Sequence, residues 1–200
     1  MIPRHLQIAM GVLLAAVVIM TVYVHRMKGR AAEAGAHAAD ARPVAPPVAG
    51  PTEQVTLYVA YDDAGVLRAQ SARLPLPAGR QQRAQELLRA LLEIYLEKNS
   101  PHPLPPGAEV RDVYIVDPGL AVIDANSVLA DNHRSGILIE ELTIASLVKT
   151  LATNIPGINR VKILVDGKER DTLAGHADLS DFYDTSAISK AADQLGVAAQ

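Results

Sequence analysis

The chain has 200 residues, a formal net charge of −3 and no cysteine. The missing cysteine excludes disulfides, a cysteine nucleophile, cysteine-ligated zinc and the acylated cysteine of a lipoprotein. The first 30 residues carry four positive and no negative side chains, so the rest of the chain is acidic, which argues against a nucleic-acid partner. With no Trp and one Phe, a folded core has to consist of aliphatic side chains.

Residues 6–24 form an uncharged and mostly apolar run. As a helix, the run spans roughly 28 Å, about the hydrocarbon core of a bilayer. It is longer than the apolar region of a signal peptide, about 7–15 residues, and no A-x-A cleavage site follows it directly. We therefore predict a signal anchor, a single transmembrane helix, behind an N-terminal tail at residues 1–5. A cleaved signal peptide and a buried helix are the alternatives.

Residues 25–54 are rich in Ala, Pro and Gly, which predicts an extended, semi-stiff linker. The basic side chains of Arg26, Lys28 and Arg30 follow the apolar run, and the positive-inside rule would place that side in the cytoplasm. The short tail before the run gives the rule few charges to compare. We expect the C-terminal domain to be extracytoplasmic, for a reason given below.

The predicted folded domain covers residues 55–185, and residues 186–200 form a C-terminal tail. The first half of the domain combines alternating strands rich in β-branched residues with one helix that has an apolar stripe. Its predicted elements are strand, strand, helix, strand and strand, at residues 55–60, 66–74, 81–98, 110–116 and 120–124.

The second half begins with a polar loop or short turn at residues 127–136, followed by a helix that starts near Glu140. Pro156 and Gly157 end this helix, because Pro has no N–H to continue it and Gly tolerates the turn. The helix is predicted to be amphipathic, with one apolar face made by Leu142, Ala145, Val148, Leu151 and Ala152.

A strand and a hairpin turn follow the helix. Val161, Ile163 and Val165 alternate with other residues as in a pleated strand. The dipeptide Asp166-Gly167 then favours the left-handed conformations of a two-residue turn. A last edge strand within residues 173–184 and a marginally amphipathic tail at residues 187–197 complete the chain.

Hairpin pairs that alternate with single helices predict an α+β fold. We expect one small mixed or antiparallel sheet with two helices on one face, preceded by the single N-terminal transmembrane helix. A doubly wound nucleotide-binding fold would need strict alternation of strands and helices, and this order lacks it.

Four motifs, taken in order, resemble the GerMN domain of sporulation, spore-germination and related cell-envelope proteins. They are an opening strand, a loop after the first long helix, the end of a strand pair, and a helix that runs into a strand and turn: Leu57-Tyr58-Val59, Leu104-Pro105-Pro106-Gly107, Val122-Ile123-Asp124, and Ser146-Leu147-Val148 leading to Val161 through Gly167. The resemblance covers about residues 55–184.

The resemblance implies a domain tethered at the membrane, outside the cytoplasm, that serves in the assembly of envelope complexes rather than in catalysis. It carries over no catalytic residue. Members tethered by a lipid have a cysteine for it, and here the helix at residues 6–24 would replace the lipid. A role in spores does not follow from the domain alone.

We predict no catalytic, cofactor-binding or metal-binding residue. His102, His133 and His176 lie in predicted loops without an H-x-x-x-H or H-E-x-x-H pair, so we expect solvated or locally hydrogen-bonded side chains. Three aspartates that do not match a calcium-binding loop are expected to form an exposed acidic edge: Asp178, Asp181 and Asp184.

Other patterns also fall short of a site. Lys168 follows Asp166-Gly167 without the remaining residues of a phosphate-binding loop, and no serine stands in a G-x-S-x-G elbow. Glu140 and Glu141 are expected to be first-turn anions favoured by the helix dipole. Four basic residues of the last hairpin are expected to form a solvated face, with an anionic polymer or acidic partner as the alternative: Arg160, Lys162, Lys168 and Arg170.

Two functions remain. The first is a membrane-anchored, non-catalytic module that mediates protein–protein interaction or assembly in the bacterial cell envelope, with an envelope protein as partner and self-association allowed. The second is an envelope enzyme or ligand-binding protein that acts on cell-wall material. It requires a concave site where His102, His133 or His176 meets an acid such as Asp112 or Asp124.

Overall fold

The computed structural model describes residues 51–116 and 118–198. The chain divides into compact units at residues 1–47 and 48–200, and the description concerns the second unit. The predicted transmembrane helix at residues 6–24 lies outside the described residues. Of the helices within the described ranges, none combines the length and the apolar character needed to cross a membrane.

The described elements follow the predicted order, and the second half contains two further helices, α3 and α5. The elements are β1 (Thr52–Tyr61), β2 (Val66–Pro75), α2 (Arg80–Leu96), β3 (Val110–Val116), β4 (Leu120–Ala125), α3 (Ser127–Asp131), α4 (Ile137–Asn154), β5 (Arg160–Val165), β6 (Tyr183–Asp184) and α5 (Thr185–Ala198). The predicted polar loop at residues 127–136 thus contains a short helix, and α4 begins before Glu140. The predicted edge strand is two residues long, and the predicted tail forms α5.

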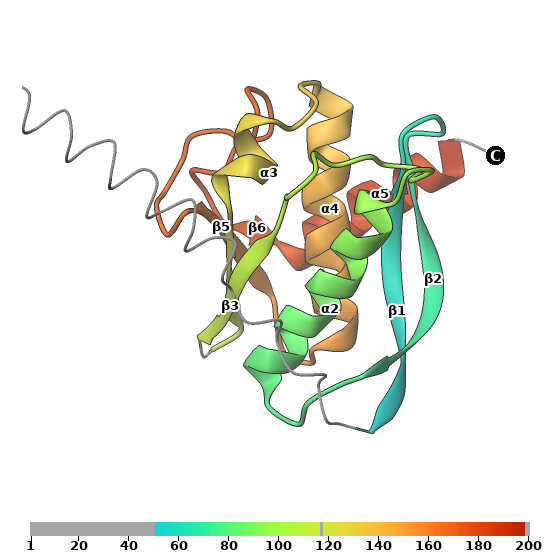
Figure 1. Ribbon diagram of the computed structural model, residues 1–200, viewed down its shortest axis with the longest axis vertical. Helices are drawn as coiled ribbons and strands as arrows, with labels where there is room; N and C mark the ends of the chain where they lie inside the picture. The colour runs from blue at the N-terminus through green and yellow to red at the C-terminus, as the bar shows by residue number, and fades with distance from the viewer. Residues whose placement is uncertain (1–50, 117, 199–200) are drawn as a thin grey trace, which may run out of the picture. The chain divides into compact units, whose positions relative to one another are not determined.

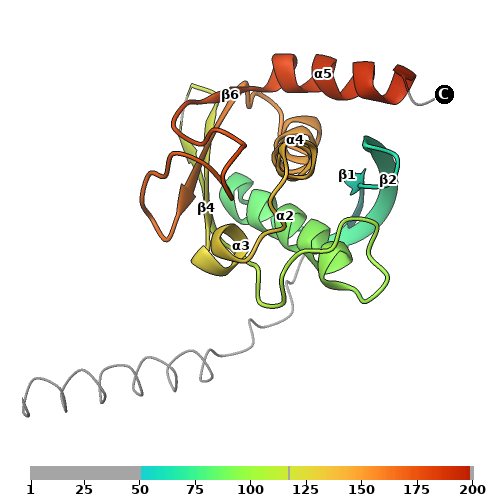
Figure 2. The same ribbon diagram turned by 90° about the horizontal axis from the view of Figure 1, so that it is seen from above.

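The predicted single sheet is wrong, because the described strands form two sheets. β1 and β2 make an antiparallel hairpin, and the second sheet has the order β3-β4-β5-β6, with β4 and β5 parallel and the other pairs antiparallel. The α+β class and the mixed character of the larger sheet are confirmed. Figure 2 shows α2 and α4 between the two sheets, with α5 lying across α4 and the hairpin.

Side chains from the helices explain why the hairpin is separate. The free edge of β1 donates its backbone N–H groups to Thr150 Oγ1, Asn154 Oδ1 and Tyr95 Oη over 3.0, 3.1 and 2.9 Å. Asn154 Nδ2 also donates to the Thr56 carbonyl over 2.7 Å. Because an unpaired strand edge otherwise invites another strand, these polar side chains end the sheet at β1.

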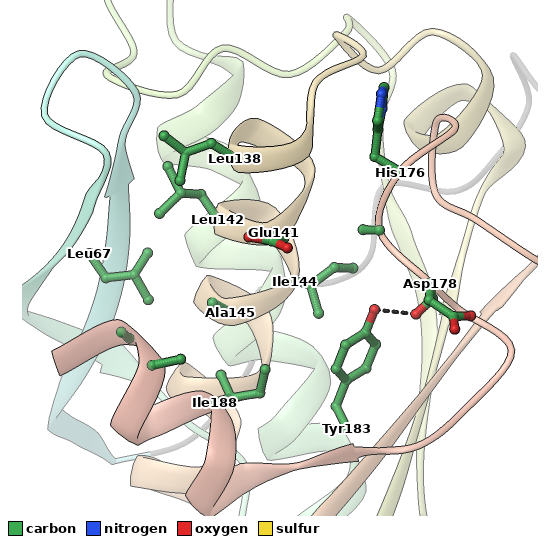
Figure 3. Close-up of a pocket in the computed structure, with 13 residues that line it drawn as sticks. Leu67, Leu138, Glu141, Leu142, Ile144, Ala145, His176, Asp178, Tyr183 and Ile188 are labelled. Carbon is green, nitrogen blue, oxygen red and sulfur yellow. Dashed lines mark hydrogen bonds between the residues drawn. The ribbon is translucent and has the colours of Figure 1, made fainter. Parts of the chain in front are cut away.

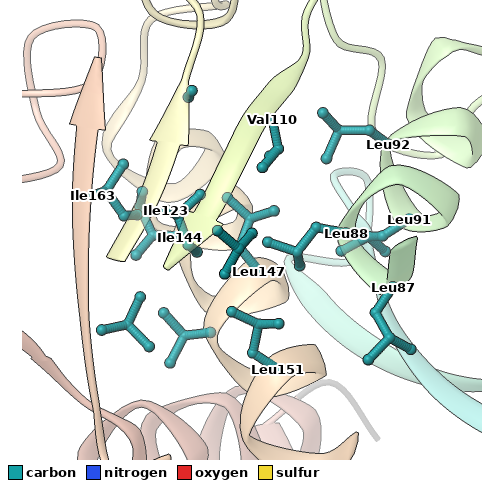
Figure 4. Close-up of a cluster of buried hydrophobic side chains, with 14 of the residues drawn as sticks. Leu87, Leu88, Leu91, Leu92, Val110, Ile123, Ile144, Leu147, Leu151 and Ile163 are labelled. Atoms are coloured by element: carbon teal, nitrogen blue, oxygen red, sulfur yellow. The ribbon is translucent and has the colours of Figure 1, made fainter. Parts of the chain in front are cut away.

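The core is aliphatic, as the composition predicts, and Tyr95 is its one fully buried aromatic side chain among the described residues. Figure 4 shows leucines of α2 and α4 meeting isoleucines of β4 and β5. Helix α4 is buried on more than its predicted apolar face, since Ile144 and Leu147 are buried as well as Leu142 and Val148. The interpretation as a helix with one buried face is therefore wrong, because two sheets cover it.

The predicted turn after β5 is confirmed. Asp166 and Gly167 have φ angles of 50° and 73°, both in the left-handed region. Val165 and Lys168 exchange backbone hydrogen bonds of 2.9 and 3.1 Å across the turn. Asp124 accepts from the Gly167 N–H over 2.7 Å, so this predicted acid holds the turn.

The burial of Leu142 gives a test of the arrangement in Figure 1. We expect Leu142→Ala to lower the free energy of unfolding by about 2–5 kcal/mol, because it opens a cavity in the core. Leu138→Ala is the matched control on the same helix, since Leu138 is 41% exposed. Denaturant unfolding of the two variants measures the difference, and equal losses would show that α4 does not present Leu142 to the core.

Candidate functional site

An apolar pocket lies beside α4 where β2, α5 and the loop before β6 meet (Figure 3). Its volume is about 380 Å³, within the range of sites that hold a small ligand or a few side chains. The apolar lining comes mainly from leucine, isoleucine and alanine side chains on three elements: Leu67 of β2, Leu138, Leu142, Ile144 and Ala145 of α4, and Ile188, Ala191 and Ala192 of α5.

Helix α5 forms one wall of the pocket, and its start is fixed by a capping side chain. Asp184 Oδ1 accepts from the backbone N–H groups of Ser186 and Ala187, each over 2.9 Å. An aspartate in this position satisfies N–H groups that have no partner within the helix. One residue of the predicted acidic edge is therefore a helix cap.

Acidic groups stand at the edge of the pocket. Glu141 and Asp178 line it and are exposed. A hydrogen bond from the Ser180 side chain lowers the pKa of Asp178, so this carboxylate is charged at neutral pH. Burial raises the pKa of Tyr183 to about 12, and its neutral hydroxyl donates to the Asp178 carbonyl. The pocket thus combines an apolar lining with negative charge.

A buried carboxylate holds the loop that forms another wall. Glu140 is fully buried, and its Oε2 accepts from the backbone N–H groups of Ala174, His176 and Ala177 over 3.0, 2.9 and 2.9 Å. Its Oε1 lies 2.9 Å from His176 Nδ1 and accepts from Gly136 N–H over 3.1 Å. Burial raises the pKa of Glu140, but these hydrogen bonds outweigh that effect and lower it to about 2.

Two of the three histidines discussed in the sequence analysis are buried. His102 is fully buried and His133 is 7% exposed. Their Nε2 atoms lie 2.7 and 2.8 Å from the same hydroxyl oxygen, Thr143 Oγ1. His102 Nδ1 lies 2.5 Å from Asp62 Oδ1. His133 fits the expectation of a locally hydrogen-bonded side chain, because its Nδ1 lies 2.7 Å from the carbonyl oxygen of Arg134. The expectation is wrong for His102, whose buried ring contacts residues distant in sequence, and Asp62 rather than Asp112 or Asp124 is the acid that it meets.

This buried cluster does not have the form of an open catalytic site. Thr143 is 1% exposed, so a substrate could not reach its hydroxyl without a change in the fold. Every buried side-chain nitrogen and oxygen within the described ranges has a hydrogen-bond partner. The described residues also contain no group of three or more side chains arranged to hold a metal ion.

The four basic residues predicted to form one solvated face lie in different environments. Lys162 is 5% exposed and donates to the carbonyl oxygens of Leu179 and Ser180 over 2.9 and 2.6 Å. Arg170 pairs with Asp131, with Nη1 and Oδ1 2.5 Å apart. These two cations therefore hold loops, and the four residues do not form one solvated surface.

The fold and the pocket define a small α+β domain in which two sheets enclose its long helices. Residues 56–171, more than half of the chain, match the family model Germane, described as sporulation and spore germination. The chain belongs to this family. The resemblance to GerMN domains that the sequence motifs carry is thereby confirmed.

Solved structures with a similar fold come from two bacteria. The tandem GerMN domains of the sporulation protein GerM from Bacillus subtilis are 23% identical, with a TM-score of 0.52; the match covers 68% of this chain and 48% of that one. The first GerMN domain of the same protein is 25% identical (66% and 98% covered, TM-score 0.49). A candidate lipoprotein from Clostridium perfringens is 23% identical (74% and 97% covered, TM-score 0.48). A search of curated proteins found no match.

The depressed pKa of Glu140 predicts a loss of stability in acid. Its contribution is complete above the ordinary pKa near 4.5 and is lost as the pH falls toward about 2. We expect Glu140→Gln to cost about 3 kcal/mol of unfolding free energy at pH 7 and to flatten the dependence over that interval.

The control is Glu141→Gln, which changes the exposed neighbour and should have little effect on stability. Unfolding in denaturant, repeated between pH 2 and pH 7, measures both. A Glu140→Gln variant with the wild-type slope would contradict the role of Glu140 as a buried anion.

Proposed function

We propose that this protein is a membrane-anchored, non-catalytic protein that mediates protein–protein interaction or assembly in the bacterial cell envelope. Its pocket binds a short apolar segment of a partner protein that also carries Lys or Arg. The observation that supports this function most directly is the contrast between the two candidate sites. The histidines and Thr143 are buried and fully hydrogen-bonded, whereas the accessible pocket has an apolar lining.

The chemistry of the pocket favours this kind of partner. Leucine, isoleucine and alanine side chains release water when an apolar group covers them. The exposed carboxylates of Glu141 and Asp178 favour a basic residue beside that apolar group, since opposite charges orient a partner and exclude wrong ones. Leu138 lines the pocket and is 41% exposed, so part of the apolar lining reaches the surface.

The proposed location depends on the first part of the chain. Residues 6–24 would anchor the protein by a single pass, and residues 25–54 would hold the domain away from the bilayer. We propose an extracytoplasmic domain because the chain belongs to a family described by sporulation and spore germination, and the resemblance to GerMN domains implies a tethered envelope domain. Arg26, Lys28 and Arg30 would then lie on the outer side.

A fusion tests anchor and orientation together. We expect alkaline phosphatase at the C-terminus to be active, because the enzyme folds only after export, and its activity to stay in the membrane pellet after carbonate washing. Active enzyme in the wash would contradict the anchor. A full-length fusion without activity would place the domain in the cytoplasm.

Site-specific crosslinking tests the pocket. A photoreactive residue at Ala191, which lines the pocket, should capture a partner in native membranes through an apolar segment with Lys or Arg. The same residue at Lys190, exposed and outside the lining, is the matched control.

Glu141→Lys should reduce the captured product at least several-fold, because it reverses a charge at the pocket edge. Equal capture at both positions, or capture through a segment without apolar residues, would contradict docking in the pocket. Crosslinks to a second copy of this chain would identify self-association instead.

A further inference from the structure

The backbone groups of the β1–β2 hairpin point either to the partner strand or to an outer edge of the hairpin. In an antiparallel pair, the N–H and C=O of one residue point to the same side, and this side alternates along the strand. The N–H groups of Thr56, Tyr58 and Ala60 point away from β2, because they donate to side chains of α4 and α2. The residues between them in β1 therefore bond β2.

The residues of β2 opposite these three point to the other edge. They are Leu67, Ala69 and Ser71, and Arg73 continues the row. Residues of such a non-hydrogen-bonded pair direct their N–H and C=O groups away from each other. Within the described ranges, these outward backbone groups of β2 have no hydrogen-bond partner. Ala69, Ser71 and Arg73 are exposed, and Figure 1 shows β2 as the outer strand of the hairpin. The four residues form an open edge, whereas side chains occupy the edge of β1.

The open edge leads to the pocket. Leu67 belongs to the open edge and also lines the pocket. At about 3.4 Å per residue, the row from Leu67 to Arg73 is roughly 20 Å long, the length of about six extended residues. A chain that pairs with Ala69, Ser71 and Arg73 therefore reaches the apolar lining at its end beside Leu67.

We propose that the partner segment binds as an added β-strand on the open edge of β2, with its apolar residue in the pocket beside Leu67. This inference rests on the proposed function and specifies how the segment is held. The unpaired backbone groups of an exposed edge strand favour pairing with another strand. In this binding mode the main-chain hydrogen bonds provide affinity, and a pocket selects the side chain that enters it.

The charges of β2 specify the segment further and argue against a second copy of this chain. Arg68 and Arg73 are exposed, and β2 contains no acidic side chain. Two copies paired along the open edge would bring the arginines of both together without a carboxylate, and like charges disfavour such a pair. A segment with Asp or Glu along β2 complements these arginines, while Glu141 and Asp178 attract Lys or Arg at the pocket. The occupant is therefore an extended segment of a different protein, acidic along β2 and apolar and basic at the pocket.

Amide hydrogen exchange of the 200-residue chain in detergent tests the open edge itself. We expect the amides of Ala69 and Ser71, which point outward, to exchange at least tenfold faster than those of Arg68 and Gln70, which bond β1. Equal protection of the four amides would overturn the proposal, because the edge would then not be open.

A proline in the open edge tests the main-chain hydrogen bonds to the partner. Ser71→Pro removes an outward N–H and leaves the bonds to β1 in place, because proline is tolerated where the N–H side of an edge strand faces solvent. Ser71→Ala keeps the N–H and is the matched control. A photoreactive residue at Ala191 reports capture of the partner segment in native membranes. We expect Ser71→Pro to reduce this capture at least tenfold and Ser71→Ala to leave it unchanged.

The outcomes separate this proposal from the proposed function. Capture at Ala191 that Ser71→Pro does not reduce would overturn strand addition and leave docking in the pocket intact. No capture at Ala191 in the wild-type chain would overturn both. If Ser71→Pro does not fold, a photoreactive residue at Ala69 decides. It should capture the same partner at residues adjoining those captured from Ala191, and capture of a second copy, or none, at Ala69 would overturn strand addition.

Discussion

The fold depends on hydrogen bonds that polar side chains of the helices make to the free edge of β1. Thr150 and Asn154 on α4 occupy backbone groups that would otherwise pair with another strand. Tyr95 on α2 does the same and contacts Ser146 Oγ at 2.5 Å. Every buried side-chain nitrogen and oxygen within the described ranges keeps a partner, so burial of α4 between two sheets does not leave its polar side chains unsatisfied.

Helix α4 therefore presents three different surfaces. Ile144, Leu147 and Leu151 meet the four-stranded sheet in the aliphatic core (Figure 4). Thr143, Ser146, Thr150 and Asn154 recur at spacings of three and four residues, as positions on one side of a helix do. Thr143 contacts the histidines, Ser146 contacts Tyr95 of α2, and Thr150 and Asn154 bond the hairpin. The remaining side lines the pocket. A helix with a single buried face could pack against only one of the two sheets.

The local elements were largely predictable from the sequence. Strand alternation, the stop at Pro156 and the turn at Asp166 depend on neighbouring residues, and the structure has them where they were expected. The second sheet was not predicted, because hydrophobic spacing alone does not tell which sheet a strand joins. The signal that could have revealed it is the polar row from Thr143 to Asn154, which an amphipathic interpretation treats as solvent-facing.

The candidate sites were less predictable, because they are made by residues distant in sequence. Asp62 and His102 are separated by 40 positions and Glu140 and Ala177 by 37, so no local motif joins them. The pocket likewise needs β2, α4 and α5 together.

The existence of the pocket nevertheless has a local cause. Helix α5 presents Ala191 and Ala192 where a core helix would present larger side chains, and protein interiors are otherwise closely packed. Small residues on α5 therefore leave space beside α4, and this space is the pocket.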